Sequence, residues 1–479
     1  MSGVHQLSGD VEETADVLGG KAHGLIALRR LGLPVPPGFV VDTGACRAFL
    51  RDGRLPDGLD ADLADAVRAL EAATQRRFGA AERPLVVSVR SGAEVSMPGM
   101  MNTVLNLGLT TAAAAGLAAE TGDPAFVLDS RGRLLSGLGE AVPDDAMAQL
   151  RMAVEAVFAS WHTPRAVTYR ELHGIPHDRG TAVVVQAMVF GNRDHRSGSG
   201  VAFSHDPSTG ARTPFGEVLF GRQGEDVVSG RSSTRPLSDL ADREPAVWSG
   251  LLAALDRIGR HYRDACHVEF TFESGRLWFL QVRSGGLVGR AAIRAAVGLA
   301  DEQIISRGTA VRRISPGDLR NARVLRIHLD DALDVLARGR GASPGVATGR
   351  IAVTADHAAR MVAAGPVILV RPYTSPLDMH GLAAAAGIVT VRGGPTSHAA
   401  VVARGLGKPA VVEAAGVIVD ADCVRAGDRV FPEGTLVTID GTGGEVVLGE
   451  PGTTTGAADP HLRRLLDWAC QADRTDRYC

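Results

Sequence analysis

The chain has 479 residues, of which 45% are hydrophobic, and its formal net charge is −3 at pH 7. This length predicts two or three globular domains, each with its own core. The balanced charge, without a basic run interleaved with aromatic residues, excludes the usual nucleic-acid-binding proteins. No hydrophobic run reaches the length of a membrane helix, so we expect no membrane segment.

The use of cysteine and lysine narrows the class further. The five cysteines are scattered, odd in number and without a Cys-x-x-Cys pair, which argues against a zinc site or a disulfide framework. The polar, acidic residues 1–14 do not resemble a signal peptide, so we predict a cytoplasmic protein. Among the 51 basic residues only Lys21 and Lys408 are lysines, and both lie in glycine-rich motifs.

The first motif is Gly19-Gly20-Lys21, which precedes an apolar helical pattern. A glycine turn before a helix can offer backbone N–H groups to a phosphate, and Lys21 adds a positive charge. The motif is not a Walker A loop, because Ala15 stands where the first glycine should be and Ala22 follows the lysine.

A predicted strand at 85–93 carries Arg90 at its end. A guanidinium group there can bind a polyphosphate through paired hydrogen bonds, although a single strand-end arginine is more often a surface residue. The segment Pro98-Gly99-Met100-Met101 is too apolar for a free loop, and it suggests a lid that closes on a ligand.

Residues 110–180 have mostly helical periodicity, whereas 181–230 are rich in β-branched and turn residues and predict β-hairpins. A further hairpin is predicted at 264–284. Its two strands carry Glu269 on one and Gln281 and Arg283 on the other, the latter two on the same face. A carboxylate and an amide oxygen suit Mg²⁺, and Arg283 can neutralise phosphate beside it. The alternative is an ordinary ion pair on a surface hairpin.

Residues 285–340 read as mainly helical, and about 30 helical residues would span roughly 45 Å as an arm. Strands that alternate with short helices follow from 341 to 450, which predicts a compact α/β domain. A short helix is expected from Pro460 to Asp473.

Within that α/β domain, a strand at 385–391 runs into Gly393-Gly394-Pro395-Thr396-Ser397-His398. Thr396 and Ser397 are good helix caps, so His398 falls in the first turn of a helix that ends near Gly405. Free N–H groups and the helix dipole make this place suitable for a side chain that carries a phosphate. A near-neutral imidazole there can act as a nucleophile, although a histidine after a turn is more often a surface or capping residue.

The stretch from Gly393 to Arg404 closely resembles the phosphohistidine signature of the phosphoenolpyruvate-utilising enzymes, and most of all that of the pyruvate phosphate dikinases. The resemblance extends over nearly the whole chain. By this resemblance His398 carries the phosphoryl group, Lys21 contacts ATP, and Gln186 and Met188 lie in a strand that lines the adenine pocket. A methionine at a position like that of Met188 is more often a residue of the hydrophobic core than a ligand contact. Thr396 would be a regulatory phosphorylation site.

The sequence departs from the family pattern at several positions. His267 stands where an acidic residue is expected, which removes a carboxylate near the metal. Other replacements stand where the family has different residues: Glu94, Asn102, His205, Tyr373 and Leu377.

The resemblance predicts an α+β and α/β multidomain protein. It consists of an ATP-grasp nucleotide-binding domain at 1–285, a helical linker at 286–340, a swivelling phosphohistidine domain at 341–450, and a tail at 451–479. The catalytic residues would be His398, Arg90 and Lys21. ATP would also contact Gln186, Met188, Glu269, Gln281 and Arg283, and Glu269 and Gln281 would hold Mg²⁺. Full-length members continue into a (β/α)₈ barrel, which we expect to be absent here.

The function implied is ATP-dependent phosphorylation of His398, followed by transfer to pyruvate on a separate barrel protein or to another small molecule. Orthophosphate or water would accept the second phosphoryl group. One alternative is a small-molecule phosphotransferase similar to the rifampin phosphotransferases, for which the linker looks short. Another is a degenerate ATP-binding regulatory subunit. A homodimer is compatible with the resemblance, and no nucleic-acid or membrane partner is expected.

Overall fold

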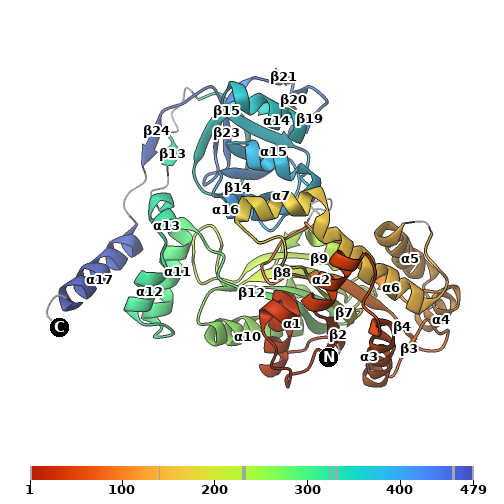
Figure 1. Ribbon diagram of the computed structural model, residues 1–479. Helices are drawn as coiled ribbons and strands as arrows, with labels where there is room; N and C mark the ends of the chain where they lie inside the picture. The colour runs from red at the N-terminus through yellow and green to blue at the C-terminus, as the bar shows by residue number, and fades with distance from the viewer. Residues whose placement is uncertain are drawn as a thin grey trace. The chain divides into compact units, whose positions relative to one another are not determined.

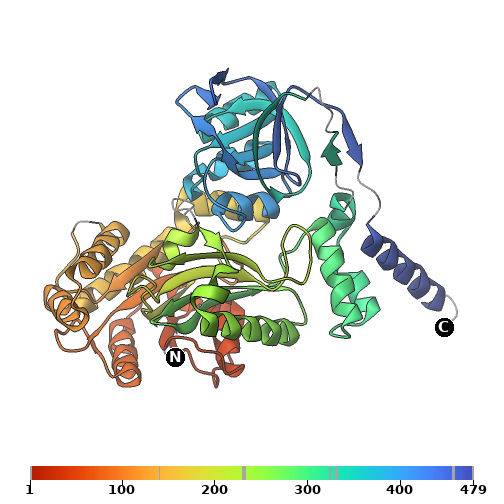
Figure 2. The same ribbon diagram turned by 180° about the vertical axis from the view of Figure 1, so that it is seen from behind.

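We analysed a computed structural model that describes residues 3–139, 141–228, 234–322, 325–328, 333–455 and 459–476. The chain divides into two compact units. The first comprises Met1–Gly198 and Phe270–Val282, and the second comprises Ser199–Glu269 and Arg283–Cys479. Helices and strands are mixed throughout both (Figure 1, and from behind in Figure 2), which confirms the predicted fold class. Within the described part of the chain, no helix is both long and apolar enough to cross a membrane.

The first unit contains an antiparallel sheet with the strand order β1-β2-β7-β5-β6. Its strands are β1 (Val4–Gln6), β2 (Gly38–Val41), β5 (Val87–Gly92), β6 (Thr103–Leu107) and β7 (Ala182–Ala187). β-branched residues, chiefly valine, are frequent in these strands, as expected for sheet surfaces that are buried.

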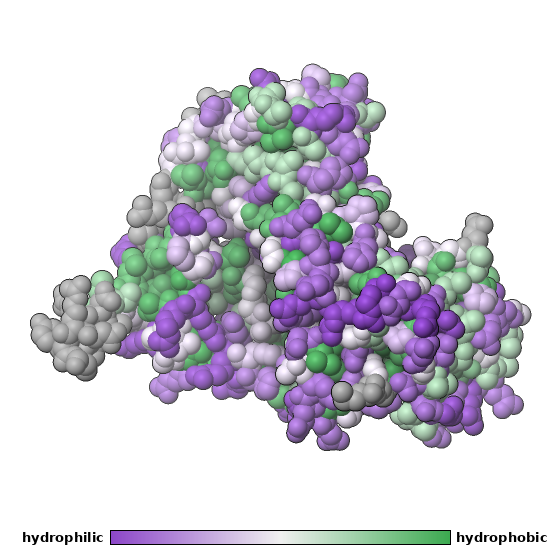
Figure 3. Space-filling model, viewed as in Figure 1, coloured by the Kyte–Doolittle hydropathy of each residue, from purple (hydrophilic) through white to green (hydrophobic). Residues whose placement is uncertain are grey.

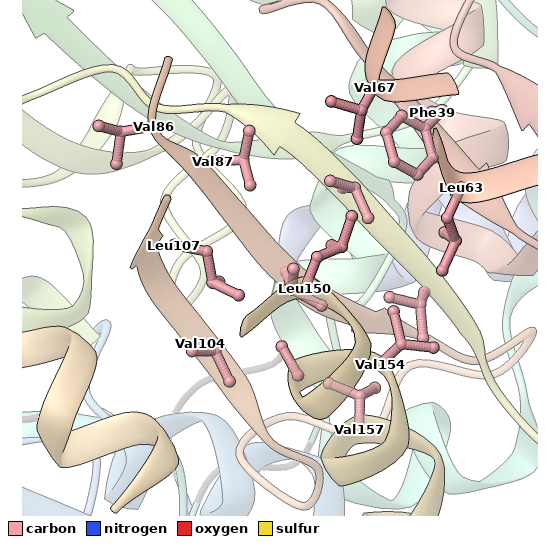
Figure 4. Packing of buried hydrophobic residues seen from close by; sticks show 14 of the residues in the cluster. Phe39, Leu63, Val67, Val86, Val87, Val104, Leu107, Leu150, Val154 and Val157 are labelled. Carbon is pink, nitrogen blue, oxygen red and sulfur yellow. The ribbon is translucent and has the colours of Figure 1, made fainter. Parts of the chain in front are cut away.

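The main core of the first unit lies between this sheet and the helices on one of its faces. Figure 4 shows Phe39 of β2 and Val104 of β6 among residues of α3 (Leu59–Thr74) and α6 (Ala146–Ala159). Leu150, Val154 and Val157 recur at helical spacing on α6, and all three are fully buried. The remaining helices and short strands of this unit are α1 (Ala15–Arg30), α2 (Thr43–Asp52), α4 (Thr111–Thr121), α5 (Pro124–Leu138), η1 (Ser160–His162), α7 (Pro164–His173), β3 (Arg77–Phe78) and β4 (Pro84–Leu85). The helical prediction for 110–180 is confirmed.

A second sheet has the order β10-β9-β8-β11-β12, and the boundary between the units crosses its last two strands. Its strands are β8 (Gly198–Phe203), β9 (Phe215–Phe220), β10 (Arg235–Pro236), β11 (Cys266–Glu273) and β12 (Arg276–Ser284). The predicted hairpin at 264–284 is therefore confirmed. Two expectations for 181–230 are wrong. β7 and β8 belong to different sheets and form no hairpin, and Gly224–Val228 forms the short helix α8 instead of a strand.

The helices that follow pack together instead of forming an extended arm. Ile293 and Val297 of α11 (Gly289–Asp301) share a hydrophobic cluster with Ala310 of α12 (Arg307–Arg313). Leu465 and Trp468 of α17 (Pro460–Asp476) complete that cluster. The expectation of an extended 45 Å helical arm is wrong, because the apolar faces of these helices pack against one another. Figure 3 shows hydrophobic residues over α11. The second unit also contains the helices α9 (Asp239–Arg243), α10 (Pro245–Tyr262) and α13 (Pro316–Asn321).

The last part of the second unit is a closed barrel with the order β14-β18-β17-β16-β15-β22-β23. Its strands are β14 (Val335–Ser343), β15 (Val346–Ala352), β16 (Val367–Arg371), β17 (Gly387–Thr390), β18 (Ala410–Ala415), β22 (Leu436–Asp440) and β23 (Glu445–Leu448). β15, β16, β17 and β18 pair in parallel, and the helices α14 (Ala355–Met361), α15 (Met379–Ala384) and α16 (His398–Leu406) alternate with them. The predicted alternation of strands and short helices is found here.

Small elements flank the barrel: η2 (Val362–Ala364), η3 (Pro376–Asp378), the sheet of β19 (Val417–Val419), β20 (Cys423–Ala426) and β21 (Arg429–Pro432), and the pair β13 (Leu325–Ile327) and β24 (Thr453–Thr455). Because β13 and β14 are strands, the expected linker is helical only to Asn321. The expected linker and tail also include 323–324, 329–332, 456–458 and 477–479, which lie outside the described residues. The predicted domain limits remain a prediction.

Candidate active site

The loop at 393–398 is built as the sequence indicates. α16 begins at His398 and ends at Gly407, which adopts a left-handed φ of 64°. Ser397 occupies the N-cap with extended dihedral angles, but its hydroxyl makes no capping hydrogen bond. Ser397 N donates to Gly394 O over 3.0 Å, so the turn before the helix is closed by the backbone. His398 therefore stands where the helix dipole and the first N–H groups favour negative charge.

The two nitrogens of the His398 ring have different surroundings. Nδ1 lies 3.2 Å from Thr374 Oγ1, while Nε2 is buried and has no hydrogen-bond partner among the described residues. Burial lowers the pKa of His398 to about 4, against the opposing effect of Asp378. The ring is therefore neutral at pH 7. A proton on Nδ1 donated to Thr374 leaves the lone pair of Nε2 free for attack.

The turn that carries Thr374 is itself well fixed. Ser375 N and Ser375 Oγ both donate to Asp378 Oδ2, over 2.8 and 3.1 Å, and Arg371 lies 3.4 Å from the same carboxyl group. Leu377, one of the departures from the family pattern, has 71% of its surface exposed, and its backbone N donates to Ser375 Oγ over 3.3 Å. The fixed turn holds Thr374 against the histidine.

A contact to the Thr396 part of the loop was missed from the sequence. Glu217, on β9, is buried, and its Oε2 accepts from Thr396 N over 3.1 Å and from the Thr396 hydroxyl. Its Oε1 accepts from Thr234 Oγ1 over 2.6 Å. Burial raises the pKa of Glu217, whereas the bonds to Thr234 and Thr396 lower it. The only sequence signal was an acidic residue inside an apolar strand.

Lys408 does not face a phosphate site. Its Nζ donates to the carbonyl oxygens of Leu382, Ala383 and Ala385, with the first at 3.2 Å and the last at 2.6 Å. These carbonyls lie at the carboxyl end of α15, where a lysine can cap the helix. Burial lowers the pKa of Lys408. Its place four residues after the phosphohistidine signature thus has a structural reason.

In the first unit, the segment around Lys21 is packed tightly against β5. Gly19 interrupts α1 with φ 74° and ψ 152°, and a Cβ at this position would lie 1.5 Å from Gly92 O. Gly20 N donates to Ala93 O over 3.0 Å. The two glycines therefore allow α1 to meet the end of the strand that carries Arg90. Lys21 is half-buried beside Gly92.

Arg90 lies two residues before the end of β5, opposite Thr103 and Val184. Its Nη1 donates to Leu280 O over 2.7 Å, so the structure brings Arg90 next to the strand segment that carries Gln281. Gln281 is buried. Within the first unit, three of the predicted nucleotide ligands, Lys21, Arg90 and Gln281, therefore lie on neighbouring segments.

The segment Pro98–Met101, which the sequence suggests as a lid, is packed in this structure, and its role as a lid remains a prediction. Met97, Met100 and Met101 are buried, and Arg165 on α7 donates from Nε to Met100 O over 3.0 Å. Arg165 Nη2 also donates to Asn102 Oδ1 over 2.9 Å. An aspartate at 102 would pair with Arg165 in the same way, so the Asn102 departure keeps the contact and removes one charge.

The two residues expected at the adenine pocket have other partners. Gln186 Nε2 donates to Pro36 O over 3.0 Å, while its buried Oε1 has no partner among the described residues. Met188 N donates to Val86 O over 2.9 Å, and its side chain packs against the main core of the first unit. The core interpretation of Met188 therefore has direct support, and the adenine contact remains a prediction.

The hairpin of β11 and β12 supplies the remaining residues. Glu269 and His267 lie two positions apart on β11, on one face of the strand, in the second unit with Arg283. Burial lowers the pKa of His267 to about 3, and nearby Arg283 acts in the same direction while Glu269 opposes it. Among the described residues, no group of three or more His, Cys, Asp and Glu side chains is arranged to hold a metal.

The two predicted metal ligands each have the chemistry that Mg²⁺ prefers. Glu269 offers a carboxylate and Gln281 an amide oxygen, which are hard donors of the kind that Mg²⁺ binds together with nucleotide phosphates.

Comparison with known proteins identifies the family. Residues 15–76 and 55–244 match the model of the pyruvate phosphate dikinase AMP/ATP-binding domain, and residues 363–444 match the mobile domain of PEP-utilising enzymes. The chain belongs to the pyruvate phosphate dikinase family. Pyruvate, phosphate dikinase of Rhizobium meliloti (strain 1021) is 39% identical over an alignment of 534 positions, gaps included. The alignment covers 98% of this chain and 59% of the relative.

Other dikinases align over a similar extent. Pyruvate, phosphate dikinase 2 of Zea mays is 40% identical over 95% of this chain and 58% of its own length, and the Clostridium symbiosum dikinase is 37% identical over 95% and 59%. The chain thus spans less than two thirds of the length of these relatives. A solved structure of the D-cycloserine synthetase DcsG aligns at 14% identity over 60% of this chain and 71% of its own, with a TM-score of 0.27, too low to bear on the fold.

Two further departures from the dikinase pattern are accommodated locally. Glu94 Oε2 accepts from Arg179 Nη1 over 2.9 Å. His205 is buried, lies 2.8 Å through Nδ1 from Ser204 Oγ, and has its pKa lowered to about 4 by burial. Neither residue is left without a partner, so these replacements do not by themselves indicate a collapsed site.

Proposed function

We propose that this dikinase-family chain is an ATP-dependent phosphotransferase in which His398 accepts a phosphoryl group from ATP and passes it to a second substrate. One observation carries the proposal. The imidazole is held through Nδ1 by Thr374, while Nε2 is buried without a partner at the start of α16. A buried polar atom without a partner is costly, and a catalytic role is one of the explanations for it.

In the proposed reaction, the lone pair of Nε2 attacks the β-phosphorus of ATP. The bond from this phosphorus to the oxygen bridging the α-phosphate breaks, and AMP leaves with the electron pair. Orthophosphate or water then takes the terminal phosphoryl group, as pyrophosphate or phosphate respectively, and phospho-His398 remains. Thr374 keeps the Nδ1 proton in place, and Lys21, Arg90 and Arg283 neutralise the phosphate charge. Phosphoryl transfer depends mainly on such positioning and charge neutralisation.

Glu269 and Gln281 would hold Mg²⁺, which supplies further neutralisation of the phosphates when bound. This role is supported by the oxygen donors that these two side chains provide and by the family match over the nucleotide-binding part of the chain. Gln186 is proposed to contact the nucleotide with its unpartnered Oε1.

For the second half of the reaction we propose pyruvate as the acceptor. The proposal rests on the match of residues 363–444 to the mobile domain of PEP-utilising enzymes and on the dikinase names of the relatives. A catalytically inactive, ATP-binding regulatory subunit is the second candidate, because His267 stands where the dikinases have an acidic residue near the metal.

ATP that carries ³²P at the β position separates the two candidates. We expect an acid-labile, base-stable label on the chain with Mg²⁺ or Mn²⁺, retained with orthophosphate and absent from His398→Ala. A matched control is His205→Ala, which removes another buried histidine and should still be labelled. Binding of ATP without any label under all metal conditions would favour the regulatory subunit and contradict the catalytic proposal.

A further inference from the structure

The half-buried imidazole of His267 makes a ring contact instead of the hydrogen bonds that are usual for a histidine. Its imidazole stacks on Phe203 of β8, with the ring centroids 5.0 Å apart and the planes at 27°. Within the described residues we find no hydrogen bond or ion pair made by either ring nitrogen. Stacking uses the face of the ring and fixes its plane, so the nitrogen-bearing edge remains available to a ligand.

The position of His267 on β11 determines the face of the strand from which its imidazole extends. His267 and Glu269 are two residues apart in a regular strand, so their side chains leave the same face of the sheet. The charged groups that act on this imidazole are Arg283, Glu269 and Arg404. Thus an imidazole and the proposed metal-binding carboxylate share one strand face.

The chemistry of these two donors differs from that of two carboxylates. Mg²⁺ prefers oxygen ligands in near-octahedral geometry and dehydrates reluctantly. Imidazole nitrogen instead suits first-row transition metals, and affinity for a mixed nitrogen and oxygen site rises from Mn²⁺ to Co²⁺ and beyond. Exchanging an acidic residue for histidine therefore changes the ion for which the site is suited.

We propose that His267 supplies a nitrogen ligand, beside Glu269, to the divalent cation that accompanies the nucleotide, and that this protein consequently binds Mn²⁺ or Co²⁺ in preference to Mg²⁺. The inference rests on the proposed function only in placing the cation at Glu269. It explains why a residue that removes a carboxylate need not inactivate the site.

Pulsed electron paramagnetic resonance of Mn²⁺ tests the proposal without measuring activity. The probe is Mn²⁺ with the α,β-methylene analogue of ATP, added to the full chain. We expect a ¹⁴N coupling to the bound Mn²⁺ that changes to ¹⁵N when the protein is uniformly ¹⁵N-labelled, which excludes a nucleotide nitrogen. His267→Asp should lose this coupling, and the control His205→Asn should keep it.

A titration of the same variants measures the preference. The affinity ratio of Mn²⁺ to Mg²⁺ should fall at least about tenfold in His267→Asp, since even outer-shell partners of a metal affect affinity to this degree. Circular dichroism checks that the variant is folded. Bound Mn²⁺ without protein-derived nitrogen coupling, or an unchanged ratio in folded His267→Asp, would overturn the proposal. Failure of the β-phosphate label with the nitrogen coupling present would instead contradict the proposed function alone.

Discussion

Two segments of this chain have the same local architecture but differ in whether their polar atoms have hydrogen-bond partners. Each has a glycine-rich turn joined to a helix, and each contains one of the two lysines: residues 19–30 in the first unit and residues 393–408 in the second. In the first, Gly19 and Gly20 are consumed by close packing on β5, down to a 1.5 Å clash for an added Cβ on Gly19. In the second, the helix start keeps Ser397 Oγ and His398 Nε2 buried and without partners among the described residues.

The difference shows that a glycine and lysine pattern does not by itself define a phosphate cradle. Lys408, in the more specific motif, caps α15, whereas the segment around Lys21 uses its glycines for packing and leaves the lysine half-buried at the strand that carries Arg90. What distinguishes the segment that we propose to be reactive is the pair of buried polar atoms without partners, Ser397 Oγ and His398 Nε2, next to a helix N-terminus. The predictions below test whether packing and chemistry are divided in this way.

The largest effect is expected from Gly19→Ala. A side chain at a φ of 74° costs about 1–2 kcal/mol, and the clash with Gly92 O adds overpacking of about 1–3 kcal/mol. Gly405→Ala in α16 is the matched control, because an added Cβ meets nothing within 4 Å. It should stabilise the protein by about 0.5–1 kcal/mol. Urea unfolding followed by circular dichroism measures both, and a normally folded Gly19→Ala that has lost only ATP binding would contradict the packing role.

The next largest effects are expected from replacing the two lysines, and the two variants should differ in what they lose. Lys408→Met leaves three carbonyl oxygens without their donor, so we expect a loss of about 2–3 kcal/mol in unfolding free energy. Lys21→Met should leave the unfolding free energy within about 0.5 kcal/mol, as for a partly exposed substitution. Its rate of labelling by ATP should instead fall about a hundredfold, the effect of removing one charge-stabilising donor. Reversed outcomes for the two variants would show that the structural assignment is wrong.

A smaller effect is expected from Thr374→Val. The change removes the only hydrogen-bond partner of His398 Nδ1 found in the described residues and keeps the shape of the side chain. Loss of one such bond, about 1–1.5 kcal/mol, corresponds to roughly a tenfold slower single-turnover labelling of His398. Thr374→Ser should restore most of the rate, and ¹⁵N NMR of the imidazole should report a changed tautomer only in the valine variant. Equal rates in all three proteins would remove Thr374 from the account.

The mildest effect is a pH dependence. Burial lowers the pKa of His398 to about 4, so Nε2 should remain unprotonated and the labelling rate nearly flat from pH 7 to 5. The unfolded imidazole binds a proton near pH 6.5, and more protons are then bound by the unfolded chain. Stability that depends on neutral His398 is therefore present above pH 6.5 and lost as the pH falls towards 4. His398→Asn should show a shallower acid loss in urea unfolding, and identical slopes would argue against a buried neutral ring.

Much of this could be predicted where local chemistry is sufficient. The start of α16 at His398, the hairpin of β11 and β12, and the helices at 110–180 all follow from caps, alternation and periodicity. The sequence could not show that β7 and β8 enter different sheets, because strand composition does not encode the partner. It also missed Glu217, which contacts Thr396 across 179 positions of the chain. The packed cluster of α11, α12 and α17 was missed for the same reason, since contacts distant in sequence leave no local pattern.

The central claim is that Nε2 of His398 is the atom that receives the phosphoryl group. The most direct test incubates the ¹⁵N-histidine-labelled chain with ATP and divalent cation and locates the phosphorus by ³¹P–¹⁵N correlation NMR, with peptide mass spectrometry to identify the residue. The geometry predicts a single phosphoramidate at Nε2 of His398, with Nδ1 still protonated towards Thr374. A phosphoryl group on Nδ1, on Thr396 or on another histidine would contradict it.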